Sequence, residues 1–407
     1  MKKGWQTKRL GDFAAAVSTG PFGSILHKSD YVDDGVPLVN PINIVGDSIV
    51  PDPSKLISDA TIKRLGNYVL EEGDIVVGRR GEIGRCAVVG PDESGWVCGT
   101  GSFFIRPLPS LDSLFLAHLI RSPDYREQLE KLSTGATMKN LSNTALGDLV
   151  VSIPPLPEQH RIVGILDQAF AAIATAKANA EKNLQNARAL FESHLQSVFT
   201  QRGEGWVEKP FSELCDIKHG YAFGGQFFSN EGEYVLLTPG NFYERGGYRD
   251  RGEKQKYFTG EIPRDYVLNE GDLLVAMTEQ AAGLLGSPIL VPQSDKFLHN
   301  QRLGLVMKKP GAAWTNEFFF HVFSTQPVRK AIHASASGVK VRHTSPTKIG
   351  EVVVAFPTSL SDQKRIVSTL ASLSEETQRL ASIYERKLAA LDALKKSLLH
   401  QAFTGQL

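Results

Sequence analysis

Two stretches of the chain, residues 158–200 and 361–404, carry apolar residues that recur every three or four positions. Glycine and proline are almost absent from both, with Gly164 as the exception, and helix-favouring Ala, Leu, Lys, Glu and Gln dominate. This spacing is typical of a coiled-coil seam, so each stretch is predicted to be one helix of about 60 Å. The apolar series are Ile162, Leu166, Ala169, Ile173, Ala176, Ala180, Leu184, Ala187, Phe191, Leu195 and Val198, and Ile366, Leu370, Leu373, Leu380, Tyr384, Leu388, Leu391, Leu394 and Leu398.

The residues that precede each predicted helix have a different pattern. Apolar runs of four or five residues, bounded by turn residues, predict short strands, and helical patterns at 113–132 and 315–333 interrupt them. Proline then ends each region, at Pro154 to Pro157 and at Pro357. The pattern predicts an α+β fold with two compact domains and two long helices. The predicted boundaries are domain 1 at 1–157, helix 1 at 158–200, domain 2 at 201–360 and helix 2 at 361–407.

The chain contains an internal repeat. The segment Gln159-His160-Arg161-Ile162-Val163 returns as Gln363-Lys364-Arg365-Ile366-Val367, and Val69-Leu70-Glu71-Glu72-Gly73-Asp74 returns as Val267-Leu268-Asn269-Glu270-Gly271-Asp272. The offset differs slightly between such pairs, which indicates loop insertions and deletions between two copies of one plan.

The repeat predicts how the long helices pair. Both carry the same apolar stripe, so each is the natural partner of the other, and a pseudo-twofold axis between the copies makes the pair antiparallel. Two similar, inverted domains at the ends of such a rod could each bind one half-site of duplex DNA, because half-sites related by a twofold axis lie about 34 Å, or a multiple of it, apart. The alternative is that each helix packs separately on its own domain.

Composition restricts the class of protein. A length of 407 residues predicts two or three domains, and 42% hydrophobic residues suffice for sizeable cores. The formal net charge of +1 excludes a basic coat, so contact with a polyanion must come from local patches or from a larger assembly. Three scattered cysteines predict neither a disulfide framework nor a zinc site. No apolar run is long enough to span a membrane, and we expect a cytoplasmic protein.

These residues resemble the specificity (S) subunit of type I restriction-modification systems, the HsdS family. The resemblance covers essentially the whole chain. It is carried by the repeat layout, the two passages from proline to Gln-x-Arg-Ile (Pro154 to Ile162 and Pro357 to Ile366), and the ending Gln401-Ala402-Phe403-Thr404-Gly405-Gln406-Leu407. The second copy departs slightly, with Thr358-Ser359-Leu360 where the first has Pro155-Leu156-Pro157.

The resemblance implies a function and a set of partners. Each globular part is implied to be a target recognition domain that reads one half of a bipartite, asymmetric site in double-stranded DNA, with the paired helices as a ruler. The chain is implied to have no catalytic activity and no cofactor of its own. It is implied to dock two modification methyltransferase subunits, which use S-adenosylmethionine, and restriction subunits, with ATP and Mg bound by those partners.

Catalytic motifs are not evident in the sequence. Asn40-Pro41-Ile42 lacks the Asn-Pro-Pro-aromatic pattern expected of an amino-methyltransferase, and no P-loop sequence occurs. Two alternatives from other classes remain open: a two-headed coiled-coil adaptor that binds proteins and not DNA, and a self-contained methyltransferase.

Candidate DNA contacts are polar or basic side chains on loops that could reach groove edges or phosphates. In domain 1 the candidates are Ser24, Arg79, Arg80, Arg85, Lys139 and Asn140. In domain 2 they are Thr278, Gln280, Asn300, Gln301, Arg302, Lys340, Arg342 and His343. Glu279 could accept a hydrogen bond from cytosine N4, with a surface salt bridge as the alternative. Phe22, Tyr221 and Phe223 are expected to be core aromatics, and each loop could also be no more than a solvated turn.

Overall fold

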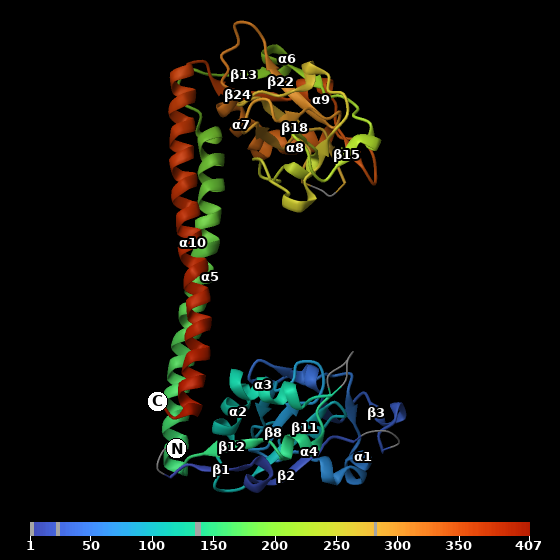
Figure 1. Cartoon of the computed structure of the whole chain (residues 1–407), viewed down its shortest axis with the longest axis vertical. Coiled ribbons are helices and arrows are strands. Elements are labelled where there is room, and N and C mark those ends of the chain that lie inside the picture. The colour runs from blue at the N-terminus through green and yellow to red at the C-terminus, as the bar shows by residue number, and fades with distance from the viewer. Residues whose placement is uncertain (1–3, 22–24, 135–139, 281–282) are drawn as a thin grey trace. The chain divides into compact units, whose positions relative to one another are not determined.

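The structure is a computed structural model that describes residues 4–21, 25–134, 140–280 and 283–407. It divides into two units, each with its own internal packing. Unit 1 is Met1–Glu181 with Glu385–Leu407, and unit 2 is Lys182–Tyr384. Each unit therefore consists of one globular α+β part and one half of each long helix (Figure 1).

Unit 1 is built on an antiparallel sheet in the order β2-β11-β8-β9. Strand β8, one of its two inner strands, is buried at every position, as its apolar sequence requires. A second sheet, in the order β10-β4-β7-β3, contains one parallel pair, β10 with β4. The bounds are β2 Ala14–Thr19, β3 Tyr31–Val32, β4 Val36–Val39, β7 Leu56–Ile57, β8 Ile75–Gly78, β9 Cys86–Val88, β10 Val97–Cys98 and β11 Ser102–Pro107.

Helices cover one face of the main sheet in unit 1. Asp112 and Ser142 each cap a helix by accepting a backbone N–H, at α2 and α4 respectively. Strand β1 pairs with β12, which leads directly into the first long helix. The remaining bounds are β1 Gln6–Arg9, β5 Ile44–Val45, β6 Ser48–Ile49, α1 Asp59–Arg64, α2 Ser113–Arg121, α3 Pro123–Leu132, α4 Asn143–Gly147 and β12 Val150–Ile153.

Unit 2 repeats this plan. Its main sheet has the order β14-β22-β18-β20 and its second sheet the order β15-β17-β16-β21, again with one parallel pair. The internal repeat expected from the sequence is confirmed. The bounds are β13 Trp206–Pro210, α6 Phe211–Leu214, β14 Cys215–His219, β15 Phe228–Ser229, β16 Tyr234–Leu236, β17 Tyr257–Phe258, β18 Leu273–Ala276, β19 Thr278–Glu279, β20 Pro288–Leu290, β21 Phe297–Leu298, β22 Leu303–Lys308, α7 Asn316–Ser324, α8 Gln326–Ser335, β23 Arg342–His343, α9 Pro346–Gly350 and β24 Val353–Pro357.

The long helices are α5, Leu156–Gln201, and α10, Leu360–Thr404, and they pack together in antiparallel orientation (Figure 1). In unit 1 the start of α5 meets the end of α10: Arg161 donates to the carbonyl oxygen of Leu407 at 3.0 Å, and Lys177 Nζ lies 2.8 Å from Asp392 Oδ1. In unit 2 the end of α5, at Phe199, and the start of α10 pack against one shared core. The predicted antiparallel pairing is confirmed, and the alternative of two separate helices is wrong.

The helix halves also belong to the cores of the globular parts. In unit 1, Ile162 and Leu166 from α5 and Phe403 from α10 lie in the same buried cluster as Phe115 of α2. The rings of Phe115 and Phe403 are 5.3 Å apart, edge to face. Each globular part is thus attached to the helices by a continuous apolar core.

The glutamine of each Gln-x-Arg-Ile passage is a buried clamp. The Gln159 amide donates to the carbonyls of Ser110 and Pro154 and accepts the N–H of Asp112, all within 2.9 Å. Gln363 makes the equivalent contacts in unit 2, with donation to the carbonyls of Ala313 and Pro357. Both side chains are buried, so each repeated glutamine ties a long helix to the strand before it and to a second helix start.

Candidate nucleic-acid interface

In both units several of the candidate residues meet at the same edge of the main sheet, where β8 or β18 ends. In unit 2 the chain leaves β18, and Thr278 and Glu279 pair with His343 and Arg342. In unit 1 the chain leaves β8, and Arg80 forms a β-bridge with Asn140. Segments that are about 60 residues apart in the sequence therefore meet at one sheet edge in each copy.

A third segment reaches this edge through a close backbone crossing. A Cβ on Gly220 would lie 2.2 Å from the carbonyl oxygen of Asn300, and one on Gly20 would lie 2.0 Å from that of Gly99. Only glycine fits there, so the same crossing is built into both units. In unit 2 it brings residues 300–302 beside the end of β18, where the N–H of Met277 donates to the carbonyl of Arg302 at 3.0 Å.

In unit 1 the two adjacent arginines do different things. The Arg79 Nε donates to Asn140 Oδ1 at 2.9 Å and to the Leu141 carbonyl at 3.1 Å, and burial lowers the pKa of its guanidinium. Arg80 is exposed at the same edge. Arg79 and Asn140 thus hold the loop together, while Arg80 can reach outward.

The other candidates of unit 1 are less favourably placed. Arg85 is the last residue of the turn between β8 and β9, and its guanidinium forms an ion pair with Glu82 at 2.6 Å. Ser24 and Lys139 lie outside the described residues, as does Phe22.

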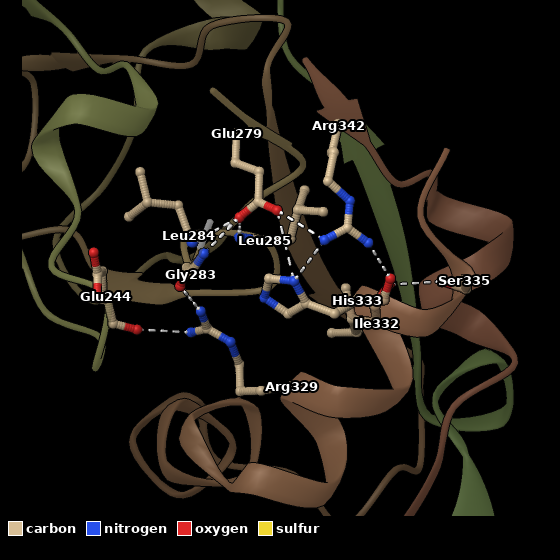
Figure 2. Close-up of polar contacts among 10 residues, drawn as sticks. All are labelled: Glu244, Glu279, Gly283, Leu284, Leu285, Arg329, Ile332, His333, Ser335 and Arg342. Atoms are coloured by element: carbon tan, nitrogen blue, oxygen red, sulfur yellow. Dashed lines mark hydrogen bonds and ion pairs between the residues drawn. The ribbon is translucent and has the colours of Figure 1, made fainter. Parts of the chain in front are cut away.

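In unit 2 the loop edge is organised by a buried carboxylate, Glu279 (Figure 2). Its Oε2 accepts the backbone N–H groups of Gly283, Leu284 and Leu285 at 2.9, 2.9 and 3.1 Å. Its Oε1 lies 3.4 Å from the Arg342 guanidinium. Because the side chain is buried and bound within the protein, Glu279 does not reach a cytosine. Of the two alternatives the structure has an ion pair, with Arg342, although it is buried and not on the surface.

Residues of α8 complete this network (Figure 2). His333 Nδ1 lies 3.6 Å from Glu279 Oε1, and burial lowers the pKa of this imidazole. Arg342 donates to the His333 carbonyl at 2.6 Å. Arg329 donates to the carbonyls of Glu244 and Gly283, and burial lowers the pKa of its guanidinium to about 10. Arg342 is therefore engaged inside the protein, although the sequence suggested a phosphate contact.

The remaining candidates of unit 2 divide by exposure. Thr278 and Asn300 are nearly buried: the Thr278 hydroxyl lies 3.2 Å from His343 Nδ1, and Asn300 Oδ1 accepts the N–H of Arg302. The side chains that face solvent at this edge are those of Gln280, Gln301, Arg302, Lys340 and His343. Phe223 is a core residue as expected, whereas Tyr221 is exposed and packs edge-on against its ring at 5.1 Å.

The sequence reasoning missed Arg329 and His333. The only local signal is their spacing of four residues on one helix, which places them on the same face. Nothing near them in the sequence indicates the carboxylate that they meet.

Three further features of the described residues concern other kinds of site. Among the described residues, no three His, Cys, Asp or Glu side chains gather so as to hold a metal ion. The three cysteines are free and buried, and burial raises the pKa of Cys86 to about 11 and that of Cys215 to about 12. Within residues 4–21, 25–134, 140–280 and 283–407, no helix has the length and apolar character needed to cross a membrane.

Comparison with known proteins gives the family. The model of the type I restriction modification DNA specificity domain matches this chain twice, at residues 2–185 and at 203–385. The chain belongs to this family. The two matches are the two copies of the repeat.

Relatives and solved structures agree with this membership. The EcoKI specificity subunit of Escherichia coli K12 is 25% identical over 92% of this chain and 83% of its own length. The StySPI specificity subunit of Salmonella potsdam is 20% identical over 100% of this chain and 90% of its own. The HsdS subunit from Thermoanaerobacter tengcongensis has the same fold, with a TM-score of 0.67 at 18% identity over 100% and 98% of the two chains. A chain from a type I R-M system studied for its complex assembly and conformational transition has a TM-score of 0.76 at 19% identity over 100% and 99%.

Proposed function

We propose that this chain is the DNA-specificity subunit of a type I restriction-modification complex, in which each globular part reads one half of a bipartite target. The observation that carries the proposal is the double match to the specificity domain, on two units with the same strand order. Two similar readers in one chain can recognise two different half-sites, because their loop sequences differ while their frameworks match.

The loop edge of each main sheet is the proposed reading surface. Arg80 in unit 1, and Gln280, Gln301 and Arg302 in unit 2, are exposed donors and acceptors at this edge. Such side chains distinguish base pairs by hydrogen bonding in the major groove, whereas lysines such as Lys340 suit phosphates. The hydrogen bonds of half-buried Arg79 and buried Glu279 within the protein would keep these loops in place.

We propose that the chemistry belongs to partner subunits. The relatives named above are specificity subunits of type I restriction enzymes. By analogy, this chain would dock two modification subunits, which bind S-adenosylmethionine, and restriction subunits, which use ATP and Mg. The exposed faces of α5 and α10 are the proposed docking surface, and the chain itself would supply no catalytic group.

The paired helices are the proposed ruler between the half-sites. Inserting four residues into α5 after Leu184 and four into α10 after Tyr384 adds about 6 Å of helix, the rise of one or two base pairs. We expect the unread spacer of the target to grow by that amount. An unchanged spacer in a folded variant would refute the ruler.

Selection from a random-sequence duplex library tests the proposal as a whole. The chain is mixed with its modification subunits, because a chain of net charge +1 should bind DNA weakly alone. Enrichment of a bipartite sequence is the expected result. No enrichment would favour the protein-binding adaptor, and methyl transfer from S-adenosylmethionine by the isolated chain would show instead that it is an enzyme.

A further inference from the structure

A short loop, which we call the finger, lies at the proposed reading surface of unit 2, called the reading edge below. Hydrogen bonds within its own backbone hold its shape. We define the finger as residues 337–343. Ser337 and His343 exchange both backbone hydrogen bonds, at 3.0 and 2.8 Å. Gly338 has φ +101°, and a Cβ there would lie 2.1 Å from the carbonyl oxygen of Val341. Glycine is therefore required at the bend.

The base of the finger is anchored in the protein. Arg342 and His343 form strand β23 against β19, and Arg342 is held by Glu279 and by the His333 carbonyl. The next residue, Thr344, donates its N–H to the Met277 carbonyl at 3.0 Å. A loop anchored in this way loses little further conformational freedom on binding, which favours recognition by its tip.

The tip residue is Val339, which is 99% exposed. A single exposed valine is ordinary on a surface. This one lies at the end of a clamped finger, next to exposed Lys340. Valine has no hydrogen-bonding group, so it can contribute to base reading only by apolar contact.

We infer that Val339 contacts the C5-methyl group of a thymine in the major groove of the half-site that unit 2 reads. The inference rests on the proposed function. The major groove admits a two-stranded ribbon, and the thymine methyl is the apolar group that base edges present there. Lys340 lies beside it in the chain and can reach a neighbouring phosphate, which would set the depth of the finger.

Replacing thymine with deoxyuridine removes that methyl group and leaves the base pairing intact. Binding of the chain with its modification subunits is measured on the selected target, with each thymine replaced in turn. We expect one position at which the wild type binds about fourfold more weakly, the effect of one buried methyl-sized group. Val339→Ala should lose about the same factor on thymine DNA and show no further loss on uracil DNA at that position, which is the signature of a direct pair in a double-mutant cycle. Val353→Ala, at a strand valine of unit 2 that is 58% exposed, is the control and should behave as the wild type.

The other outcomes overturn the inference. A Val339→Ala complex with the wild-type response to every uracil shows that Val339 does not meet a thymine methyl. An equal loss on all sequences indicates a wedge or a backbone contact instead. A half-site without thymine on either strand also rules it out. If the wild type selects no sequence at all, the proposed function fails first.

Discussion

Glu279 stabilises the reading edge of unit 2, and its replacement has a cost that can be worked out from its contacts. Its side chain is 1% exposed, accepts three backbone N–H groups and faces Arg342. Removing one partner of a buried ion pair costs about 3–5 kcal/mol, and each buried donor left without an acceptor costs about 1–3 kcal/mol. Because Arg342 stays 35% exposed, water compensates part of the lost ion pair. We therefore expect Glu279→Ala to lower the free energy of unfolding by about 3 kcal/mol.

Urea unfolding of the full chain measures this loss. Trp206 and Trp314 belong to unit 2, and Trp314 is buried in its core, so replacing Trp5 and Trp96 with Phe makes the fluorescence a report on unit 2. With a slope of about 2 kcal/mol per molar urea, the midpoint should fall by about 1.5 M.

Two further variants separate the effect of the Glu279 charge from that of its hydrogen bonds and provide an exposed control. Glu279→Gln keeps an oxygen for the N–H groups but loses the charge, so its effect should be about half as large. Glu261→Ala, at an exposed carboxylate of unit 2, should change stability by less than about 0.5 kcal/mol. If Glu279→Ala lowers the free energy of unfolding by less than about 1 kcal/mol, the contacts of Glu279 do not stabilise unit 2 and the reasoning is refuted.

Three more predictions concern buried and exposed polar groups. Gln363→Ala leaves buried carbonyl and N–H groups unpaired, so it should lower the free energy of unfolding, measured in urea, by about 2–4 kcal/mol. Gln378→Ala, on the exposed side of α10, is the control and should lower it by less than about 0.5 kcal/mol. Equal effects would show that the contacts of Gln363 do not stabilise unit 2. Burial lowers the pKa of His299 from 6.5 to about 4, so the unfolded chain binds more protons between these values and stability should fall as the pH drops from 7 to 5. His299→Gln should remove about 2 kcal/mol of that pH dependence, and an unchanged pH profile would contradict the assignment. Lys340→Ala should weaken binding to specific and random DNA alike and make the slope of log K against log salt less negative by about 1, whereas a changed sequence preference would show that Lys340 reads bases.

The architecture was predictable from the sequence because its signals are local. The apolar stripes of α5 and α10 follow the helical period, and the repeated Gln-x-Arg-Ile passages reveal the duplication without any structure. The role of the repeated glutamine was not predictable. Gln159 meets Ser110, which is 49 positions away, and only the folded chain brings them together.

The reading edge was predictable in outline and not in detail. The segments around Arg80 and residues 337–343 were selected for their polar composition. Within its own unit, each of them does meet another candidate segment at the edge of the main sheet. Residue type does not reveal which basic groups point inward, however. Arg79 and Arg342 bind partners within the protein, and the buried Glu279 meets Arg342 and His333, which lie more than 50 positions further along the chain. Such long-range contacts leave no pattern in a local stretch of sequence.

Sequencing the methylated DNA of cells that carry the complete system tests the central claim most directly. The account predicts a modified site of two short specified segments separated by a fixed number of unspecified base pairs. Exchanging residues 206–358 for those of another family member should then change one segment and leave the other and the spacing unaltered. A continuous motif, or a motif that does not depend on this chain, would contradict the account.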